Sequence, residues 1–406
     1  MKPIDKFDVF LLYFVEGFIW FHFYCDDKMP DNWDLFKKID VNSNLDIEYL
    51  KNEIGKYFPF YDLKYDIDKA AFFCRIDNDT LEEKFDILRR SLSKRDYVPM
   101  LRYEQGEHII YVFQKPKKKQ KPIWVNFALL ALTLATTILT GSLLYMNISD
   151  VWTLSNPFDI FLPENLFFGA VLFAFPLMSI LIIHEMGHYY ISKRHGILTS
   201  LPFFIPVPPI FTGFNIGTFG ALISSRDPMP DNKALFDIGI AGPLAGFMVA
   251  LPVTIIGIAN SSVIPVSEIS AGETVLGTSI LFSAISDFLL DVPNNYVINQ
   301  SPIAFAGWVG LLITSINLLP AGQLDGGHIF RAVFGEKQKY AGWIAIFIMV
   351  FTGWWFFAFI IIFIMGMMHP PPLNDKVEID LKRKLLFLVA VIILIVCFIP
   401  FPIKYI

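Results

Sequence analysis

Two histidines and a glutamate lie within five residues at the end of a long apolar run, and this constrains the fold more than any other feature of the chain. Residues 167–183 carry no charged side chain and lead directly into His184-Glu185-Met186-Gly187-His188. In a helix, positions i and i+4 share one face, about 6 Å apart along the axis. Two imidazoles at this spacing can bind one zinc ion, with the intervening glutamate as general base.

The apolar setting decides how this motif is interpreted. A bare H-E-x-x-H pattern occurs by chance in soluble helices. Ionisable groups at membrane depth, however, cost roughly 2.5 kcal/mol or more each. Burial without a metal would leave His184, Glu185 and His188 unsatisfied, so the sequence predicts a catalytic metal site.

The composition indicates an α-helical polytopic membrane protein. Hydrophobic residues make up 54% of the 406 residues and charged residues only 17%, against about 25% charged residues in a soluble domain. The net charge of −5 gives no reason to expect nucleic acid as a partner. The three cysteines are far apart and match neither a metal-ligand spacing nor a disulfide framework, so buried thiols are expected at Cys25, Cys74 and Cys397. About six transmembrane helices are expected, over residues 125–146, 166–190, 234–258, 303–334, 340–368 and 385–399.

Basic residues near the ends of these segments predict the orientation. Lysines crowd residues 115–121, just before the first segment, which places the amino-terminal region in the cytoplasm or its topological equivalent. The basic residues at 376–384 conflict with this orientation if residues 340–368 cross the membrane once. A short hairpin around Thr352-Gly353 would remove the conflict. We expect a single crossing, with the earlier charges overruling the later ones.

Residues 1–120 are expected to form a separate, small soluble α+β domain. Residues 9–25 are apolar, but Glu16 and His22 interrupt the run and no signal-peptide cleavage site is evident. A hairpin that turns at Glu16-Gly17 is therefore favoured over a membrane span. Asp79 is the expected N-cap of a helix. That helix is expected over residues 81–92. Three strands are expected, over residues 70–76, 97–103 and 108–113. Nothing in this domain resembles a catalytic site.

A catalytic zinc ion needs a third protein ligand and an open position for water. The fourth apolar segment is interrupted by Asn317, Pro320 and the glycines around Asp325. Irregular backbone at membrane depth is tolerated only where protein or water lines it. Asp325 is therefore the expected third ligand. His328, one turn later, is the alternative ligand, or a group that orients Asp325. Two further histidines are expected at the membrane interface, His195 and His369.

The segment that follows the histidine pair has an unusual composition. Residues 197–223 are too rich in proline and glycine for a membrane span and too apolar for a free loop. We expect a re-entrant segment with an extended stretch near residues 218–223, where an unpaired strand edge could bind unwound substrate by strand addition. A plain loop at the membrane surface is the alternative. Small residues at 241–246 predict close packing of the third segment beside the zinc helix. Asp237, near its inner edge, is expected either to orient a histidine or to be solvated.

The two motifs around His184 and Asp325 resemble those of the site-2 protease family of intramembrane zinc metalloproteases. Residues 217–221 and 241–246 resemble its chloroplast and archaeal branch. The resemblance covers about residues 122–406 and implies a transmembrane zinc metalloprotease domain there. It implies one zinc ion per chain on His184, His188 and Asp325, with Glu185 as the catalytic base. It also implies that Asn317 contacts the substrate or the transition state.

The expected function is hydrolysis of peptide bonds in or near the transmembrane segments of membrane-anchored proteins. Glu185 would take a proton from the attacking water, and Asn317 would donate a hydrogen bond to the oxyanion or to the substrate backbone. Two alternatives remain, and both fit less well. A membrane zincin that trims lipid-modified peptides usually completes its site with a glutamate or a histidine. A non-catalytic metal-binding homologue should lack a ligand or the base, and this chain has all four residues.

Overall fold

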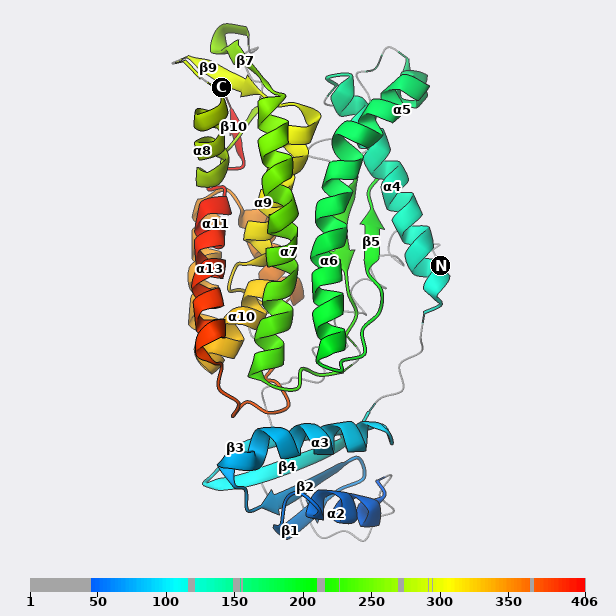
Figure 1. Ribbon diagram of the computed structural model, residues 1–406, viewed down its shortest axis with the longest axis vertical. Coiled ribbons are helices and arrows are strands. Elements are labelled where there is room, and N and C mark those ends of the chain that lie inside the picture. The colour runs from blue at the N-terminus through cyan, green and yellow to red at the C-terminus, as the bar shows by residue number, and fades with distance from the viewer. Residues whose placement is uncertain are drawn as a thin grey trace, which may run out of the picture.

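The computed structural model describes residues 45–115, 121–148, 154, 156–209, 216–225, 227–268, 274–290, 292–293, 295–365 and 369–405. It shows an amino-terminal α+β region at one end of a larger helical region (Figure 1). The expected hairpin within residues 9–25 lies outside the described residues.

The α+β region is a four-stranded antiparallel sheet with strand order β1-β2-β4-β3 and two helices. Both helices contribute to one buried core together with Ala70 and Phe72 of β2. Cys74 is buried in the same core, and burial raises the pKa of its thiol to about 12. Of the three expected buried thiols, the structure describes Cys74 and Cys397, and both are buried. The elements are α2 (Ile47–Gly55), β1 (Phe60–Tyr65), β2 (Lys69–Cys74), α3 (Leu81–Ser93), β3 (Tyr97–Glu104) and β4 (Glu107–Gln114).

The structure confirms the predicted helix and the three predicted strands of this region, and it adds β1. The expected N-cap at Asp79 is wrong. The backbone N–H of Asp79 donates to the Asp77 carboxylate instead (3.2 Å), and a 3₁₀ turn forms over Asn78–Thr80. The α-helix therefore starts later, with Thr80 in the N-cap position and without a side-chain capping bond.

The helical region contains three helices that are long and apolar enough to cross a membrane, among the described residues. They cover the first three expected segments, as Ile123–Tyr145, Pro163–Arg194 and Asn232–Ala259. The second of these contains a π-helical turn, Ala170–Ala174, between α5 and α6. The helices are α4 (Ile123–Tyr145), α5 (Pro163–Gly169), α6 (Phe175–Arg194), α7 (Asn232–Ala259), α8 (Ile280–Leu289), α9 (Pro302–Asn317), α10 (Asp325–Phe334), α11 (Gln338–Phe351), α12 (Trp355–Ile360) and α13 (Leu381–Cys397).

Short antiparallel strand pairs complete the helical region. The pair β5 (Phe203–Pro206) and β6 (Thr218–Leu222) lies within the segment that was expected to be re-entrant, and β6 matches the extended stretch predicted near residues 218–223. The other two pairs are β7 (Ser262–Pro265) with β9 (Tyr296–Asn299), and β8 (Thr274–Leu276) with β10 (Ile403–Tyr405). Strands β7, β9 and β10 lie at the end of the helical region opposite the α+β region (Figure 1).

The fifth expected segment does not continue in one direction. Helix α11 begins where Gln338 donates to the Pro320 carbonyl (2.9 Å). It has 14 residues, about 21 Å of helix at 1.5 Å per residue, which is shorter than the roughly 30 Å hydrocarbon core of a bilayer. The chain turns at Gly353, which has a φ of 81°. The Trp354 indole N–H then donates to the Ile399 carbonyl (2.8 Å), beyond the end of α13.

After this turn the chain returns to the end where α11 began. Helix α12 and the π-helical segment Ile361–Met365 lead back toward His369, whose ring lies 4.3 Å from that of His328 in α10. The expected single crossing of residues 340–368 is therefore wrong, and the hairpin around Thr352-Gly353 is present. The later basic residues lie at the same end as the earlier ones, since Lys376 lies over the Tyr103 ring of the α+β region.

Residues 373–375 connect the two regions. The Leu101 N–H of β3 donates to the Leu373 carbonyl (2.8 Å), and Leu373 is buried in the core of the α+β region. Asn374 forms β-bridges with both Leu101 and Asp231, the residue before α7. Two ion pairs, Lys233–Glu82 and Lys115–Asp227, also join the regions. The α+β region is thus attached to the end of the helical region where α6 ends and α7 begins.

Candidate metal centre

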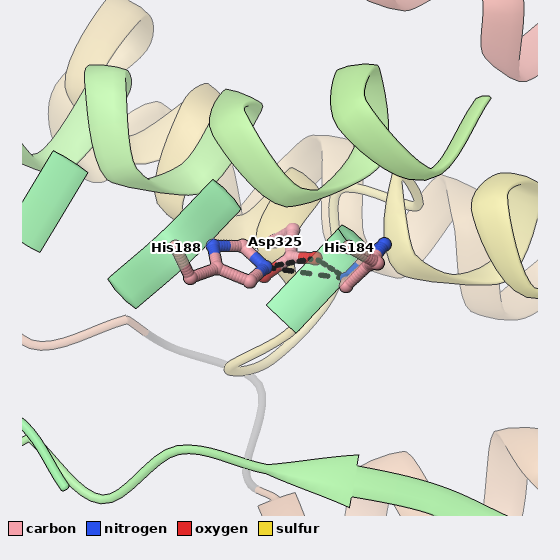
Figure 2. A group of neighbouring side chains, drawn as sticks. All are labelled: His184, His188 and Asp325. Atoms are coloured by element: carbon pink, nitrogen blue, oxygen red, sulfur yellow. Dashed lines mark hydrogen bonds and ion pairs between the residues drawn. The ribbon is translucent and has the colours of Figure 1, made fainter. Parts of the chain in front are cut away.

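Three side chains from two helices point toward one another inside the helical region (Figure 2). His184 and His188 lie one turn apart on α6, and Asp325 is the first residue of α10. The two Nε2 atoms are 3.2 Å apart. Asp325 Oδ2 lies 3.3 Å from Nε2 of His184 and 3.2 Å from Nε2 of His188. The three donor atoms therefore form a nearly equilateral triangle.

This triangle fits a tetrahedral zinc ion. Zinc bonds of about 2.0–2.1 Å place two ligand atoms of a tetrahedron about 3.3–3.4 Å apart. Nδ1 of His188 lies 2.7 Å from the Ile238 carbonyl oxygen, which can only accept, so Nδ1 carries the proton and Nε2 presents a lone pair. Two imidazoles and a carboxylate that turn lone pairs toward one point form a donor set suited to zinc.

A break between two helices brings Asp325 to this point. Helix α9 ends at Asn317, and α10 begins at Asp325 after the turn through Pro320. A Cβ atom on Gly326 would clash with the Leu318 carbonyl oxygen, and one on Gly327 would clash with the Gly322 carbonyl oxygen. Only glycines at these positions let the chain fold back closely enough to start α10 beside α6 and α7.

Helix α7 touches the metal-site histidines through its backbone. Gly239, Gly242 and Gly246 lie on one face of the helix, with α6 against the latter two. A Cβ atom on Gly242 would lie 2.5 Å from Cδ2 of His188 and closer still to its Nε2, and one on Gly246 would lie 3.0 Å from Nδ1 of His184. The sequence indicated close packing here from the small residues at 241–246. It did not reveal that the imidazole rings themselves fill the glycine gaps.

The two predicted catalytic residues lie at the same place. Glu185 follows His184 on α6 and is buried. Asn317, the last residue of α9, has Nδ2 3.3 Å from Nε2 of His184. All five residues singled out from the sequence thus come from three helices, α6, α9 and α10, that meet around one point.

The alternative ligand is not part of the triangle. The ring of His328 packs against that of His369, and within the described residues its Nδ1 has no hydrogen-bond partner.

His195 is also elsewhere, at the end of α6, where its Nε2 lies 3.0 Å from Asp237 Oδ2. Arg383 donates to both oxygens of the same carboxylate. Asp237 therefore contacts a histidine, as one interpretation of the sequence had it, but not one of the pair on α6.

The helices and the donor set define a class of site: a candidate zinc site held between apolar helices. Comparison with known proteins specifies the family. Residues 172–356 match the model of peptidase family M50, so this part of the chain is similar to that family, to which the site-2 proteases belong. The resemblance found in the sequence is thereby confirmed.

Named relatives point to zinc as well. Over 251 residues the chain is 28% identical to a "Probable zinc metalloprotease EGY1, chloroplastic" of Oryza sativa subsp. japonica, covering 57% of this chain and 41% of the relative. Over 163 residues it is 33% identical to a "Probable zinc metalloprotease EGY2, chloroplastic" of Arabidopsis thaliana, covering 39% of this chain and 28% of the relative. The chain thus spans less than half the length of these relatives. No solved structure matches.

Proposed function

We propose that the chain is an intramembrane zinc metalloprotease that hydrolyses peptide bonds in or near the transmembrane segments of membrane-anchored proteins. The observation that carries the proposal is the triangle of His184, His188 and Asp325 donor atoms, spaced for one zinc ion among apolar helices. Glu185 and Asn317 lie beside it. In this proposal residues 122–406 form the protease domain, and residues 1–120 form a separate soluble domain.

The roles of the residues follow from their positions. When bound, zinc would lower the pKa of a coordinated water to about 7 and polarise the scissile carbonyl. Glu185 takes the proton of the attacking water and later delivers it to the leaving amine. Asn317 donates a hydrogen bond to the oxyanion or to the substrate backbone. The Ile238 carbonyl keeps the His188 ring in the tautomer that leaves Nε2 free for the metal.

A helical substrate must unwind first, because its peptide groups are engaged in its own hydrogen bonds. Strand β6 supplies a partner for the unwound chain. It pairs with β5 alone among the described strands, and Phe219, its second residue, is 79% exposed. A strand of the β5–β6 pair runs below the three side chains in Figure 2, on the side opposite α7. Strand β6 also contacts α6, so a substrate strand added to β6 would run beside the helix that carries the histidine pair.

The proposed topology is multi-pass, with the α+β region in the cytoplasm or its equivalent. Lys115, Lys193, Lys233 and Arg383 all lie at the end to which this region is attached, as the ion pairs and the end of α6 show. An excess of basic residues marks the cytoplasmic side of membrane proteins. The hairpin of α11 and α12 supports the proposal, because it brings the basic residues after residue 375 to this side too.

The decisive experiment replaces the base. Full-length protein with Glu185→Gln, purified in lipid, is expected to keep its zinc and to cleave a model transmembrane substrate at least about 100-fold more slowly. Tyr190→Phe, on the exposed side of the same helix, is the matched control and should cleave normally. Undiminished cleavage by the Glu185→Gln protein would remove Glu185 from its role.

The ligand set has its own test. Asp325→Asn should lower the zinc content measured by elemental analysis, because an amide is a much weaker zinc ligand than a carboxylate. His328→Asn should leave the zinc content near that of the unaltered chain. The reverse pattern would transfer the third ligand to His328.

A further inference from the structure

Helix α4 is apolar enough to cross a membrane and yet carries a buried row of polar side chains. Asn126, Thr133, Thr136, Thr137 and Thr140 are all buried. Polar groups in an apolar segment are costly unless they find partners within the protein. Two of these five reach beyond their own helix, and both donate to backbone carbonyls just before β5 or β6. Ser142, near the end of α4, is also buried and donates to the Ile160 carbonyl instead.

Asn126 holds the start of β5. Its side-chain amide donates to the carbonyl oxygens of Leu201 (2.8 Å) and Pro202 (3.0 Å), the two residues before the strand. An Asn amide has two donor hydrogens, so both are used on the same short stretch of backbone. The entry into β5 is thereby fixed to the beginning of α4.

Thr136 holds the start of β6. Its hydroxyl lies 2.7 Å from the Gly217 carbonyl oxygen, nearer than the two carbonyls of its own helix at 3.0 and 3.1 Å. The same Gly217 carbonyl accepts from the Val207 N–H (3.1 Å), at the end of β5. A Cβ atom on Gly217 would lie 2.6 Å from the Thr137 Cα, so backbone meets backbone at this contact.

The two contacts fix the strand pair at separate heights along α4. Asn126 and Thr136 are ten residues apart, about 15 Å at 1.5 Å per residue. A pair of strands held at two such points can neither slide along α4 nor tilt against it. Strand β6 is therefore held at a set height beside α6, which carries the histidine pair.

The height of β6 matters because an added strand takes its register from the strand it joins. Each residue of a strand advances about 3.3 Å, and a slip of one residue turns every side chain to the opposite face. A small movement of β6 would thus bring a different peptide bond to the zinc site.

We propose that Asn126 and Thr136 are positioning residues that fix the cleavage register, by holding the substrate-binding strand at a set height relative to the metal centre. This inference rests on the proposed function. It assigns to α4 the choice of the peptide bond that is cut, whereas the residues on α6, α9 and α10 perform the hydrolysis.

The test compares two threonines one turn apart on α4. Thr136→Val removes the hydroxyl that reaches Gly217. Thr140→Val makes the same change at a buried hydroxyl that donates only within its helix, to the Thr136 carbonyl (3.1 Å). Products of a model transmembrane substrate are measured by mass spectrometry on full-length protein in lipid. Loss of one hydrogen bond should raise the fraction cut at neighbouring peptide bonds about fivefold in Thr136→Val, without lowering the zinc content. Thr140→Val should give the same product pattern as the unaltered chain. Thr136→Ser should also give that pattern, because serine keeps the hydroxyl.

Equal product patterns for the two valine variants, with Glu185→Gln inactive, would overturn the positioning role and leave the proposed function intact. If the unaltered chain does not cleave, the proposed function fails and the positioning role fails with it. A measurement without substrate checks the contact directly. Amide hydrogen exchange of residues 216–222 should be faster in Thr136→Val than in Thr140→Val, and equal rates would refute the contact whatever the activity.

Discussion

Helices α7 and α4 both support the candidate site, but by opposite means. Helix α7 meets the ligand histidines with bare backbone, at Gly242 and Gly246. Helix α4 meets the β5–β6 pair with an amide and a hydroxyl, at Asn126 and Thr136. The glycine contacts set the distance between α7 and α6. The hydrogen bonds from α4 set the position of the β5–β6 pair along α4.

The two kinds of contact respond differently to a substitution. A glycine contact leaves no room for one more carbon, so any substitution moves the neighbouring group. A hydrogen bond can be removed singly, with a net effect of about 1 kcal/mol for a typical bond. We therefore expect α7 to determine whether the metal is held at all, and α4 to determine where the substrate lies. The following predictions test this division.

The largest effect is expected from Gly242→Ala. The new Cβ atom would overlap the His188 ring, and the cheapest relief is to rotate that side chain away from the metal, since no backbone has to move. Zinc affinity should fall by more than about 100-fold, beyond the range for altering groups that only orient a ligand. Zinc content after dialysis against a graded series of chelator concentrations measures this, and the helical circular dichroism should be unchanged.

Met248→Ala is the control for this substitution, because Met248 lies on the exposed side of the same helix. It should bind zinc like the unaltered chain. Full zinc occupancy in Gly242→Ala would show that the His188 ring can shift without leaving the zinc ion. In that case α7 would not determine whether the metal is held.

Parts of this arrangement were predictable from sequence because they depend on local spacing. The i, i+4 histidines and the glycines around Asp325 mark the site through helix periodicity and backbone freedom. The small residues at 241–246 likewise indicated close packing. The roles of Asn126 and Thr136 carried no such signal. Their acceptors lie 75 to 81 residues further along the chain, and one polar residue in an apolar helix does not reveal its partner.

The hairpin of α11 and α12 was missed for a different reason. Residues 340–368 have the length and hydropathy of a single span, and the Thr352-Gly353 dipeptide is a weak local signal. What stabilises the turn is tertiary, since the Trp354 indole N–H donates to the Ile399 carbonyl. The charge distribution had pointed to the hairpin, because a single crossing left the residues around Lys384 on the wrong side. Here the basic residues were the better guide than the length of the apolar segment.

A smaller effect on the metal is expected from Gly246→Ala. The new Cβ atom would lie 3.0 Å from Nδ1 and 3.1 Å from Cβ of His184. A shift of a few tenths of an ångström relieves this contact, so His184 can stay near the zinc ion. We expect zinc affinity to fall about 10-fold, at the low end for groups that orient a ligand. Competition with a chelator ranks the three α7 variants, and a Gly246→Ala protein weaker than Gly242→Ala would contradict the geometry.

The smallest effect is expected from a third contact, which the α+β region makes with the end of α6. Arg89 on α3 is buried, and its Nη2 donates to the His195 carbonyl (3.3 Å) and to Asp86 (2.7 Å). His195 is the C-cap of α6, where a cation also interacts favourably with the helix dipole. Arg89→Ala should leave the zinc content unchanged, speed amide exchange over residues 191–197, and lower cleavage about two- to threefold.

Arg90→Ala is the matched control, because Arg90 also pairs with Asp86 (2.7 Å) but is exposed. Both substitutions remove an arginine from the same turn of α3 and the same ion-pair partner, so a difference between them isolates the contact with α6. Faster exchange at the end of α6 in Arg89→Ala alone would show that the α+β region steadies the helix that carries the histidine pair. Equal amide exchange over residues 191–197 in both variants would contradict this. The site would then be supported by α7 and α4, and the α+β region would not influence the metal centre.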